Sequence, residues 1–169
     1  RMKGLSYLIR ALAEIEKENH APLKLLVLGR DRQGPYLRLA RKAGISQEVI
    51  FAGSTDEPEK YYGAADLLVH PTFYDACSLT VLEAQASGLP VVTTASDGAS
   101  GVISHGEDGR VIKEIRKGDQ LKTAINYFLD KEIRPSASCE ERRMGETHTA
   151  KINAELMMGI FREVTGVTR

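Results

Sequence analysis

Apolar positions between residues 1 and 130 follow two patterns that alternate along the chain. One has the spacing of three and four residues that is typical of an amphipathic helix, and the other is a short unbroken run typical of a buried strand. The first pattern predicts helices at residues 5–15, 36–43, 58–65 and 121–129, and a further helix that ends before Gly88. The second predicts strands at residues 23–29, 49–53, 66–71, 91–94 and 110–112. This alternation indicates an α/β fold with a Rossmann-like parallel sheet and helices on both faces.

The pattern changes after residue 134. A polar stretch leads to apolar residues at helical spacing, which are Ile152, Leu156, Ile160 and Phe161. We therefore expect a Rossmann-like domain over residues 1–134 and a C-terminal helical tail over residues 135–169. An exposed apolar face on that tail would favour self-association. The chain opens on a helix where a doubly wound sheet normally opens on a strand, so we interpret it as a fragment of a longer protein.

Composition narrows the classes of function. Lys plus Arg and Asp plus Glu number 23 each, and no basic run is interleaved with aromatic residues, so we do not expect nucleic acid as a partner. The longest apolar runs are too short to span a bilayer. Cys77 and Cys139 lack metal-ligand spacing and predict free thiols in a reducing, cytoplasmic location. Peripheral contact with the inner face of a membrane, through another part of the protein, stays open.

Two carboxylates stand where a turn-rich loop enters a helix. Asp75 and Glu83 can hold two parts of an extended polar ligand, and the free N–H groups of the first helical turn can hold an anion between them. A nucleotide-sugar, with hydroxyls at both ends and a diphosphate in the middle, has that shape. Asp75 equally fits a turn aspartate, and Thr80 with Glu83 equally fits a capping box. His70, at the end of a strand, fits a semi-buried histidine better than a catalytic group.

Four segments of this sequence are typical of one family. They are "RMKGLSYLIRAL", "LLVLG", "VIFAGSTDEPEKYYGAADLLVHPT" and "DACSLTVLEAQASGLPVVTT". Through about residue 130 the chain resembles the C-terminal half of the group 1 glycosyltransferases, also called glycosyltransferase family 4. Within this family, the segment "FYDACSLTVLEA" most resembles the corresponding segment of the lipopolysaccharide core glucosyltransferases. The resemblance implies a two-domain GT-B protein whose C-terminal domain binds a nucleotide-sugar donor, with an N-terminal acceptor domain that this chain lacks.

The resemblance also implies roles for individual residues. Lys3 would contact the donor diphosphate, with Arg1 filling part of the role of an arginine that the family carries upstream. Asp75 would hold hydroxyls of the donor sugar, and Lys3 and Asp75 would together serve catalysis. The family has glutamate where Asp75 stands, so this contact would lengthen or pass through water. Glu83 would bind the ribose hydroxyls. The remaining donor-binding residues would be Ala76, Cys77, Ser78, Leu79, Thr80, Gly29, Arg30 and Thr55.

The implied reaction is a retaining glycosyl transfer without cofactor or metal, and the sequence has no Asp-x-Asp metal motif. A nucleoside diphosphate would leave through an oxocarbenium-like state while an acceptor hydroxyl attacks from the same face. The expected donor is UDP-glucose or a similar nucleotide-sugar, and the expected acceptor is a glycan or lipopolysaccharide core. Two alternatives stay open: a nucleotide-binding module without turnover, favoured by Asp75, and a sugar-nucleotide epimerase of the same fold. A nicotinamide-binding domain is disfavoured because "GRDRQG" lacks the G-x-G-x-x-G pattern.

Overall fold

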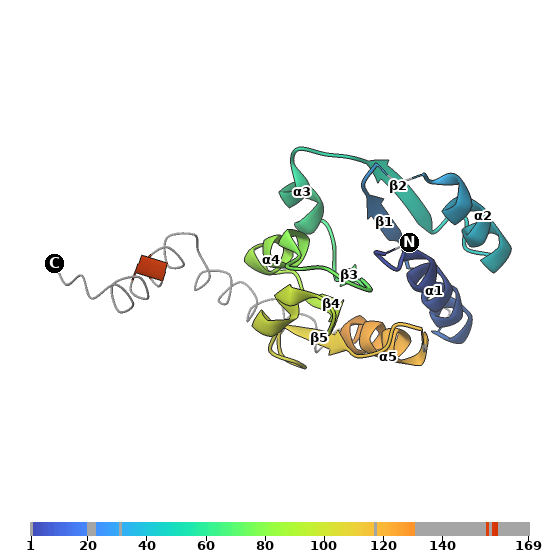
Figure 1. The fold of residues 1–169 in the computed structure, drawn as a ribbon. Helices are drawn as coiled ribbons and strands as arrows, with labels where there is room; N and C mark the ends of the chain where they lie inside the picture. The colour runs from blue at the N-terminus through green and yellow to red at the C-terminus, as the bar shows by residue number, and fades with distance from the viewer. Residues whose placement is uncertain are drawn as a thin grey trace.

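The computed structural model describes residues 2–19, 23–30, 32–116 and 118–130, together with residues 155, 157 and 158 (Figure 1). The strands are β1 (Leu25–Leu28), β2 (Val49–Gly53), β3 (Leu68–His70), β4 (Val91–Thr94) and β5 (Gly109–Ile112). The helices are α1 (Leu5–Asn19), α2 (Gly34–Ala43), α3 (Pro58–Tyr62), α4 (Leu79–Ala86) and α5 (Gly118–Leu129), with a 3₁₀ helix η1 (Gly98–Val102). Strands and helices therefore alternate in the predicted order.

The strands pair in parallel, as predicted, but they form two sheets rather than one. β1 pairs with β2, and a second sheet has the order β3-β4-β5. No ladder joins β1 to β3 within the described residues, which differs from the single sheet that we expected. Apolar runs predicted buried strands, although Leu26 of β1 and Ile50 of β2 are exposed. The hydrogen-bonding neighbours of a strand depend on segments far away in the sequence. The parallel order within each sheet still brings the carboxyl ends of neighbouring strands to one edge.

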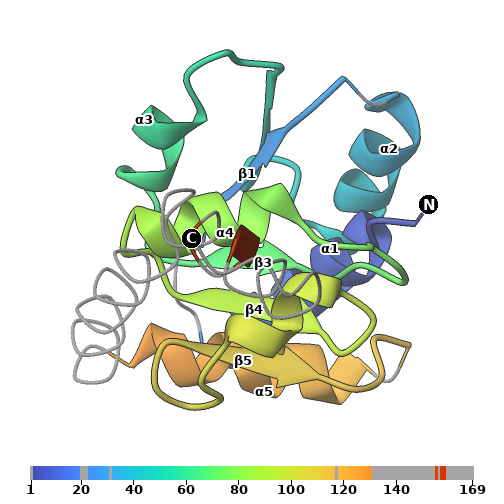
Figure 2. The ribbon, with the colours of Figure 1, turned by 60° about the vertical axis from the view of Figure 1, so that its left-hand side comes forward.

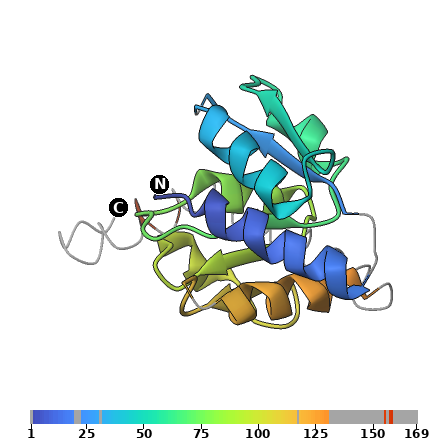
Figure 3. The ribbon, with the colours of Figure 1, turned by 90° about the vertical axis from the view of Figure 1, so that its right-hand side faces the viewer.

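Helices cover both faces of the β3-β4-β5 sheet. Neighbouring residues of a strand point to opposite faces, and here Val92 packs in a core with α1, α2 and α5, whereas Val91 packs in a second core with α3, α4 and η1. α1 and α5 lie side by side in Figures 1 and 3. Figure 2 shows α4 and α5 on opposite sides of β4 and β5. The second core is small and consists of Tyr62, Val81, Ala84, Leu89, Val91 and Ala99.

Local signals placed some helix ends correctly, whereas α1 extends to Asn19 and α5 begins already at Gly118. Pro35 lies in the first turn of α2 and Gly44 ends that helix, as predicted. α3 begins at Pro58 but ends at Tyr62, three residues earlier than expected from the sequence pattern. Of the expected tail, only residues 155, 157 and 158 are described, and they are helical. The apolar positions of the tail and its boundary at residue 135 lie outside the described residues, so that domain division and the self-association stay predictions. No helix in the described part of the chain is long and apolar enough to cross a bilayer.

Candidate functional site

The loops that follow β3 and β4 meet at the carboxyl edge of the second sheet. Asp75 follows β3, Asp97 follows β4, and the two form an isolated parallel bridge. The N–H of Asp75 donates to the carbonyl of Ser96 at 3.1 Å, and the N–H of Gly98 donates to the carbonyl of Asp75 at 2.9 Å. Ligands of open α/β folds bind at this edge, outside the carboxyl ends of the strands. The backbone therefore holds Asp75 in a fixed place where a ligand would be expected.

The turn before α1 packs against the same loop. The N–H of Phe73 donates to the carbonyl of Met2 at 2.8 Å, and the rings of Tyr7 and Phe73 make an edge contact with centroids 5.5 Å apart. Gly4 has a φ of 66°, and a Cβ there would lie 1.9 Å from the carbonyl oxygen of Pro71. Only glycine allows the chain to pass so close in this conformation. The consequence is that Lys3 is carried to the loop that holds Asp75.

Lys3, Asp75 and His70 form one charged cluster. The ammonium of Lys3 donates to Oδ2 of Asp75, and Nε2 of His70 lies 3.3 Å from the same oxygen. The hydrogen bond from Lys3 is the main cause that lowers the pKa of Asp75 below its ordinary value. Burial, followed by the charge of Lys3, lowers the pKa of His70 below 6.5. Near neutral pH the cluster therefore pairs a carboxylate with an ammonium beside a neutral imidazole.

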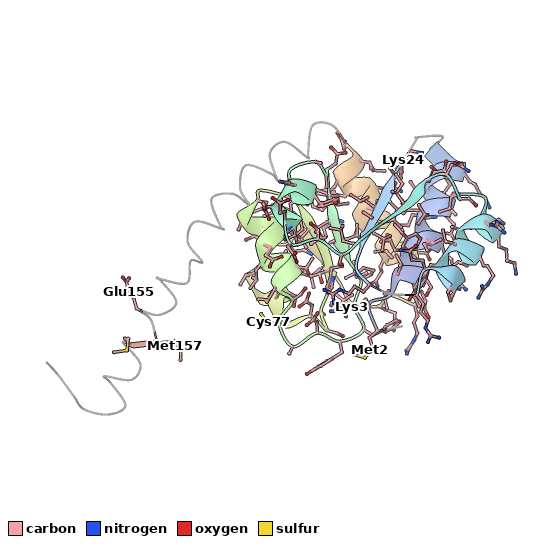
Figure 4. All side chains as sticks on the ribbon, turned by 90° about the horizontal axis from the view of Figure 1, so that it is seen from above. Met2, Lys3, Lys24, Cys77, Glu155 and Met157 are labelled. Atoms are coloured by element: carbon pink, nitrogen blue, oxygen red, sulfur yellow. The ribbon has the colours of Figure 1, made fainter. Side chains whose placement is uncertain are left out.

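Figure 4 helps to locate this cluster in the molecule. Lys3, Met2 and Cys77 lie toward one side, and Lys24, just before β1, lies toward the opposite side. Lys24 marks the amino end of a strand, so the separation agrees with a site at the carboxyl ends. The side chain of Lys3 is 58% exposed, whereas that of Asp75 is 19% exposed. A ligand can therefore reach the ammonium from solvent.

Asp97 connects the start of α4 to β4 from a buried position. Its side chain is 1% exposed, and Oδ1 accepts from the N–H groups of Ser78 at 3.2 Å and Ala99 at 3.0 Å. Oδ2 lies 2.9 Å from the hydroxyl of Thr93 on β4. A buried carboxylate is tolerated when donors surround it in this way. Asp97 thus fixes the position at which α4 begins.

The backbone of Ala76 and Gly98 approaches closely beneath the same loop. A Cβ on Gly98 would lie 1.8 Å from the carbonyl oxygen of Ala76, so glycine is required there by space alone. Ala76 and Cys77, both expected near the donor, are exposed, and the thiol of Cys77 is free. The loop is therefore supported by the backbone at Gly98, while Ala76 and Cys77 are accessible to solvent.

The first turn of α4 supplies backbone donors. Leu79 begins the helix, and Ser78 is the N-cap residue but makes no side-chain cap hydrogen bond. The N–H of Ser78 is already bound to Asp97, so it is not free, contrary to the expectation that Ser78 would offer its N–H to an anion. The N–H groups of Leu79 and Thr80 have no acceptor among the described residues. These two donors remain available at the positive end of the helix dipole.

Glu83 does not form the capping box that was one interpretation of the sequence. Thr80 lies inside α4 and not at its cap, because the contact with Asp97 sets the helix start two residues earlier. The side chain of Glu83 accepts a hydrogen bond from the hydroxyl of Tyr62 on α3, with 2.9 Å between the oxygens. Glu83 is otherwise exposed. Its carboxylate is therefore free on one side for a ligand.

The other expected donor-binding residues lie at the ends of β1 and β2. The N–H of Gly29 donates to the carbonyl of Gly53 at 2.7 Å, and Arg30 is exposed. The hydroxyl of Thr55 accepts from the N–H of Glu57 at 3.0 Å, as in an ordinary turn. No hydrogen bond or ion pair joins these residues to the loop of Asp75 within the described residues. They follow the carboxyl ends of their strands, and their binding roles stay predictions. Arg1 lies outside the described residues.

Tyr62 and Asp97 were missed by the sequence interpretation. The aspartate stands in "TTASDG", which has the composition of an ordinary turn, although its position directly after a buried strand could have drawn attention to it. The tyrosine is 21 residues from Glu83, and only the packing of α3 against α4 brings the two together. Only Asp97 therefore had a local signal, its position after a strand, whereas Tyr62 had none.

Two other features bear on the chemistry of the site. The described residues contain no group of three or more His, Cys, Asp or Glu side chains that could hold a metal ion. A cavity of about 360 Å³ lies between β5 and α5, lined among others by Arg110, Lys113 and Thr123. None of the candidate site residues lines that cavity. The site is thus an open surface with an ammonium, two carboxylates and two free N–H groups.

Comparison with known proteins supports a transferase class for this fold and site. Residues 1–147 match the family described as glycosyl transferases group 1. Because this match covers well over half of the sequence, the chain belongs to the group 1 glycosyltransferases. The family that the sequence motifs indicated is therefore confirmed.

Individual relatives refine the comparison. Lipopolysaccharide glucosyltransferase WaaG of Escherichia coli (strain K12) is 34% identical over 127 residues, which are 75% of this chain and 34% of the relative. D-inositol 3-phosphate glycosyltransferase of Corynebacterium aurimucosum is 30% identical over 142 residues, which are 79% of this chain and 34% of the relative. The chain thus spans 34% of the length of each of these curated relatives.

Solved structures share the fold. The crystal structure of WaaG, a glycosyltransferase involved in lipopolysaccharide biosynthesis, has a TM-score of 0.81 at 30% identity and covers 87% of this chain and 40% of that chain. Anabaena HepE in complex with UDP-glucose has a TM-score of 0.81 at 20% identity and covers 94% of this chain and 45% of that chain. The second likeness shows the fold alone.

Proposed function

We propose that this chain binds the nucleotide-sugar donor of a retaining glycosyltransferase. The observation that carries the proposal is the arrangement around the start of α4, where two free N–H groups lie in the first turn and Lys3, paired with Asp75, packs on the adjoining loop. A carboxylate stands on each side of these donors, Asp75 in the loop and Glu83 in the helix. Such a site complements an anion that carries hydroxyl groups on both sides.

The diphosphate of the donor would be held by the N–H groups of Leu79 and Thr80 and by Lys3. Helix N-termini bind phosphate because their N–H groups are unsatisfied and the helix dipole favours negative charge. Lys3 would leave or share its contact with Asp75 when a diphosphate arrives, since its side chain is 58% exposed and is held by one hydrogen bond. These donors would do the work that a divalent metal does in other transferases, so we propose that binding does not require magnesium.

The two carboxylates would hold the ends of the donor. Glu83 would accept hydrogen bonds from the ribose hydroxyls, since the residue is exposed and Tyr62 holds only Oε2 of its carboxylate. Asp75 would accept from hydroxyls of the transferred sugar, next to the carbon that reacts. Its side chain is shorter than the glutamate of the family pattern, so we propose that a water molecule bridges part of this contact.

The proposed reaction breaks the bond between the anomeric carbon and the diphosphate oxygen and forms a bond from that carbon to an acceptor oxygen. The acceptor hydroxyl attacks the anomeric carbon on the same face from which the leaving group departs. The proton of this hydroxyl passes to the departing nucleoside diphosphate. Negative charge grows on the diphosphate as it leaves, and donors that are already oriented stabilise it by about 3 kcal/mol each. The N–H groups of α4 and Lys3 would supply that stabilisation.

The identity of the substrates is a finer part of the proposal. WaaG is named as a lipopolysaccharide glucosyltransferase, and Anabaena HepE was solved in complex with UDP-glucose. On these two names we propose UDP-glucose as the donor and a lipopolysaccharide core or related glycan as the acceptor. The acceptor would be bound by an N-terminal domain of the same protein. Free Cys77 and a nucleotide-sugar donor fit a cytoplasmic reaction, in contact with the inner face of the membrane through that domain.

Calorimetric titration of the 169-residue chain with UDP, ADP, GDP and their glucose conjugates tests the proposal. We expect one base to be preferred, binding that persists in EDTA, and a loss of about tenfold or more in affinity for Glu83→Gln. Glu107→Gln is the matched control, because Glu107 is an exposed carboxylate in the turn before β5, at the opposite edge of the sheet. Absence of binding to every nucleotide by a folded sample would overturn the proposal. Binding that requires magnesium would overturn its metal-independent part.

A further inference from the structure

Tyr62 of α3 contacts the candidate site through its hydroxyl group, which is hydrogen-bonded to Glu83 of α4. The ring lies at the end of α3 and packs in the small core with residues of α4 and β4, and the residue is 8% exposed. Its hydroxyl reaches out of that core and donates to Oε2 of Glu83 at 2.9 Å. The buried ring fixes where the hydroxyl points. The bond therefore joins a donor on a buried ring to an exposed carboxylate.

The donor and acceptor roles in this bond are fixed. Burial is the main cause that raises the pKa of the Tyr62 phenol above its ordinary value of 10.0, and the hydrogen bond and charge of Glu83 raise it further. A hydrogen bond with Thr80 acts on this pKa in the opposite direction. Because the phenol keeps its proton throughout the physiological range, Tyr62 always donates and Glu83 always accepts. The carboxylate is thus held by one oxygen and leaves the other free.

A glutamate without a partner at a helix surface samples several rotamers. A ligand that binds only one of these rotamers loses affinity, because fixing the side chain costs conformational entropy. The bond from Tyr62 selects a rotamer before the ligand arrives. A hydrogen bond from a residue that is itself locked by packing is the usual way in which a binding group is held in its productive geometry. The bond also satisfies the hydroxyl of a buried tyrosine, whereas the exposed carboxylate of Glu83 would be solvated by water without it.

We propose that Tyr62 is a positioning residue that holds the Glu83 carboxylate ready to accept the vicinal hydroxyls of the donor ribose. This inference rests on the proposed function, since it names the group that prepares the ribose end of the same site. It assigns to α3 a part in selecting ribonucleotides over deoxyribonucleotides. Tyr62 itself does not touch the ligand, and its effect passes through Glu83.

The variant Tyr62→Phe tests this role with little change in packing, because the ring stays and only the hydroxyl is lost. The probes are the nucleoside diphosphate that wild-type protein binds best, with UDP as the first choice, and its 2′,3′-dideoxy analogue. We expect Tyr62→Phe to weaken binding of the ribonucleotide about tenfold and to leave binding of the dideoxy analogue unchanged. In the Glu83→Gln background the same substitution should cause no further loss, because the group it positions is already altered. Tyr61→Phe, in the same helix, is the matched control.

Each outcome decides the question. If wild-type protein binds no nucleotide, the proposed function fails and takes this inference with it. If wild-type protein binds and Tyr62→Phe binds the ribonucleotide equally well, the proposed function stands and the positioning role is wrong. If Tyr62→Phe weakens both analogues by the same factor, Tyr62 supports the structure generally and the positioning role is again wrong. A loss confined to the ribonucleotide, and absent from Tyr61→Phe, supports the inference.

Discussion

The ammonium of Lys3 donates a hydrogen bond to the carboxylate of Asp75, which lies 72 positions further along the chain. The sequence interpretation assigned these residues to two different parts of a ligand, the diphosphate and the sugar. In the structure they neutralise each other, and His70 lies against the same carboxylate oxygen. A donor whose diphosphate attracts Lys3 would release the carboxylate of Asp75 for the sugar. Binding of the two parts of the donor would therefore be coupled through this pair.

Replacing Lys3 by methionine is expected to weaken binding of a nucleoside diphosphate about tenfold and to reduce the dependence of that affinity on salt. Folding should change by less than about 1 kcal/mol, because the side chain of Lys3 is 58% exposed and surface pairs contribute little. Calorimetry at two salt concentrations measures both effects. Lys24→Met, an exposed lysine at the far end of β1, is the control (Figure 4). Equal affinities for Lys3→Met and wild-type protein would exclude Lys3 from the anion site.

Replacing Asp97 by alanine is expected to lower the free energy of unfolding by about 2–5 kcal/mol, since it leaves two backbone N–H groups without their acceptor. These groups belong to Ser78 and Ala99, both buried. Urea unfolding followed by circular dichroism measures the change. Asp56→Ala, which removes an exposed aspartate, should stay within about 0.5 kcal/mol of wild-type protein. A similarly small effect for Asp97→Ala would show that the start of α4 is fixed by something else.

Gly98→Ala and Gly101→Ala form a matched pair within η1. A Cβ at Gly98 would overlap the carbonyl oxygen of Ala76, at 1.8 Å, whereas a Cβ at Gly101 would meet nothing within 4 Å. We expect Gly98→Ala to displace the loop that carries Asp75, with a loss of about 2 kcal/mol or more in stability and of nucleotide binding. Gly101→Ala should be neutral or slightly stabilising. Equal behaviour of the two variants in thermal unfolding and titration would argue against the close approach.

Stability should fall as the pH decreases below 6.5, because of His70. Burial and the charge of Lys3 lower the pKa of His70, although Asp75 and Asp97 act in the opposite direction. The unfolded chain then takes up a proton near pH 6.5 and the folded protein only at lower pH, so protons favour unfolding in that window. The lowered pKa of Asp75 adds a second loss, since its contribution disappears as the pH falls below the ordinary value of 3.8.

Urea unfolding at pH 7.5, 6.5 and 5.5, comparing wild-type protein with His70→Gln, measures the contribution of the histidine. The unfolding free energy of the variant should change less across this range than that of wild-type protein. An identical slope for both proteins would mean that His70 has the same proton affinity folded and unfolded.

The sequence predicted what depends on local patterns. The stripe from Leu5 to Ile15 predicted α1, and Pro35 with Gly44 predicted the limits of α2, because turn and helix preferences act over a few residues. The parallel pairing of strands also followed, since helices alternate with them. The division into two sheets did not follow, because it depends on which distant strands share hydrogen bonds.

The candidate site shows the same difference between features that local patterns predict and features that depend on distant contacts. Asp75 and Glu83 could be chosen from the sequence because they flank a helix start, which is a local signal. The capping box at Thr80, one of the two interpretations of Glu83, was wrong, because the contact that sets the helix start comes from Asp97, 19 residues beyond Ser78. Tyr62 could not be found, since nothing near it in the sequence indicates a partner on α4. The site is completed by contacts that arise from tertiary packing and that the spacing of residues along the sequence does not indicate.

Nuclear magnetic resonance of the ¹⁵N-labelled chain, titrated with UDP in the presence of EDTA, locates the nucleotide site residue by residue. We expect the amide signals of Leu79 and Thr80 to move furthest, to saturate together, and to need about ten times more nucleotide for half-saturation in Lys3→Met. Movement centred instead on Arg110 and Lys113, at the cavity between β5 and α5, would contradict a donor site at the start of α4. So would a folded protein whose spectrum does not change with UDP, ADP or GDP.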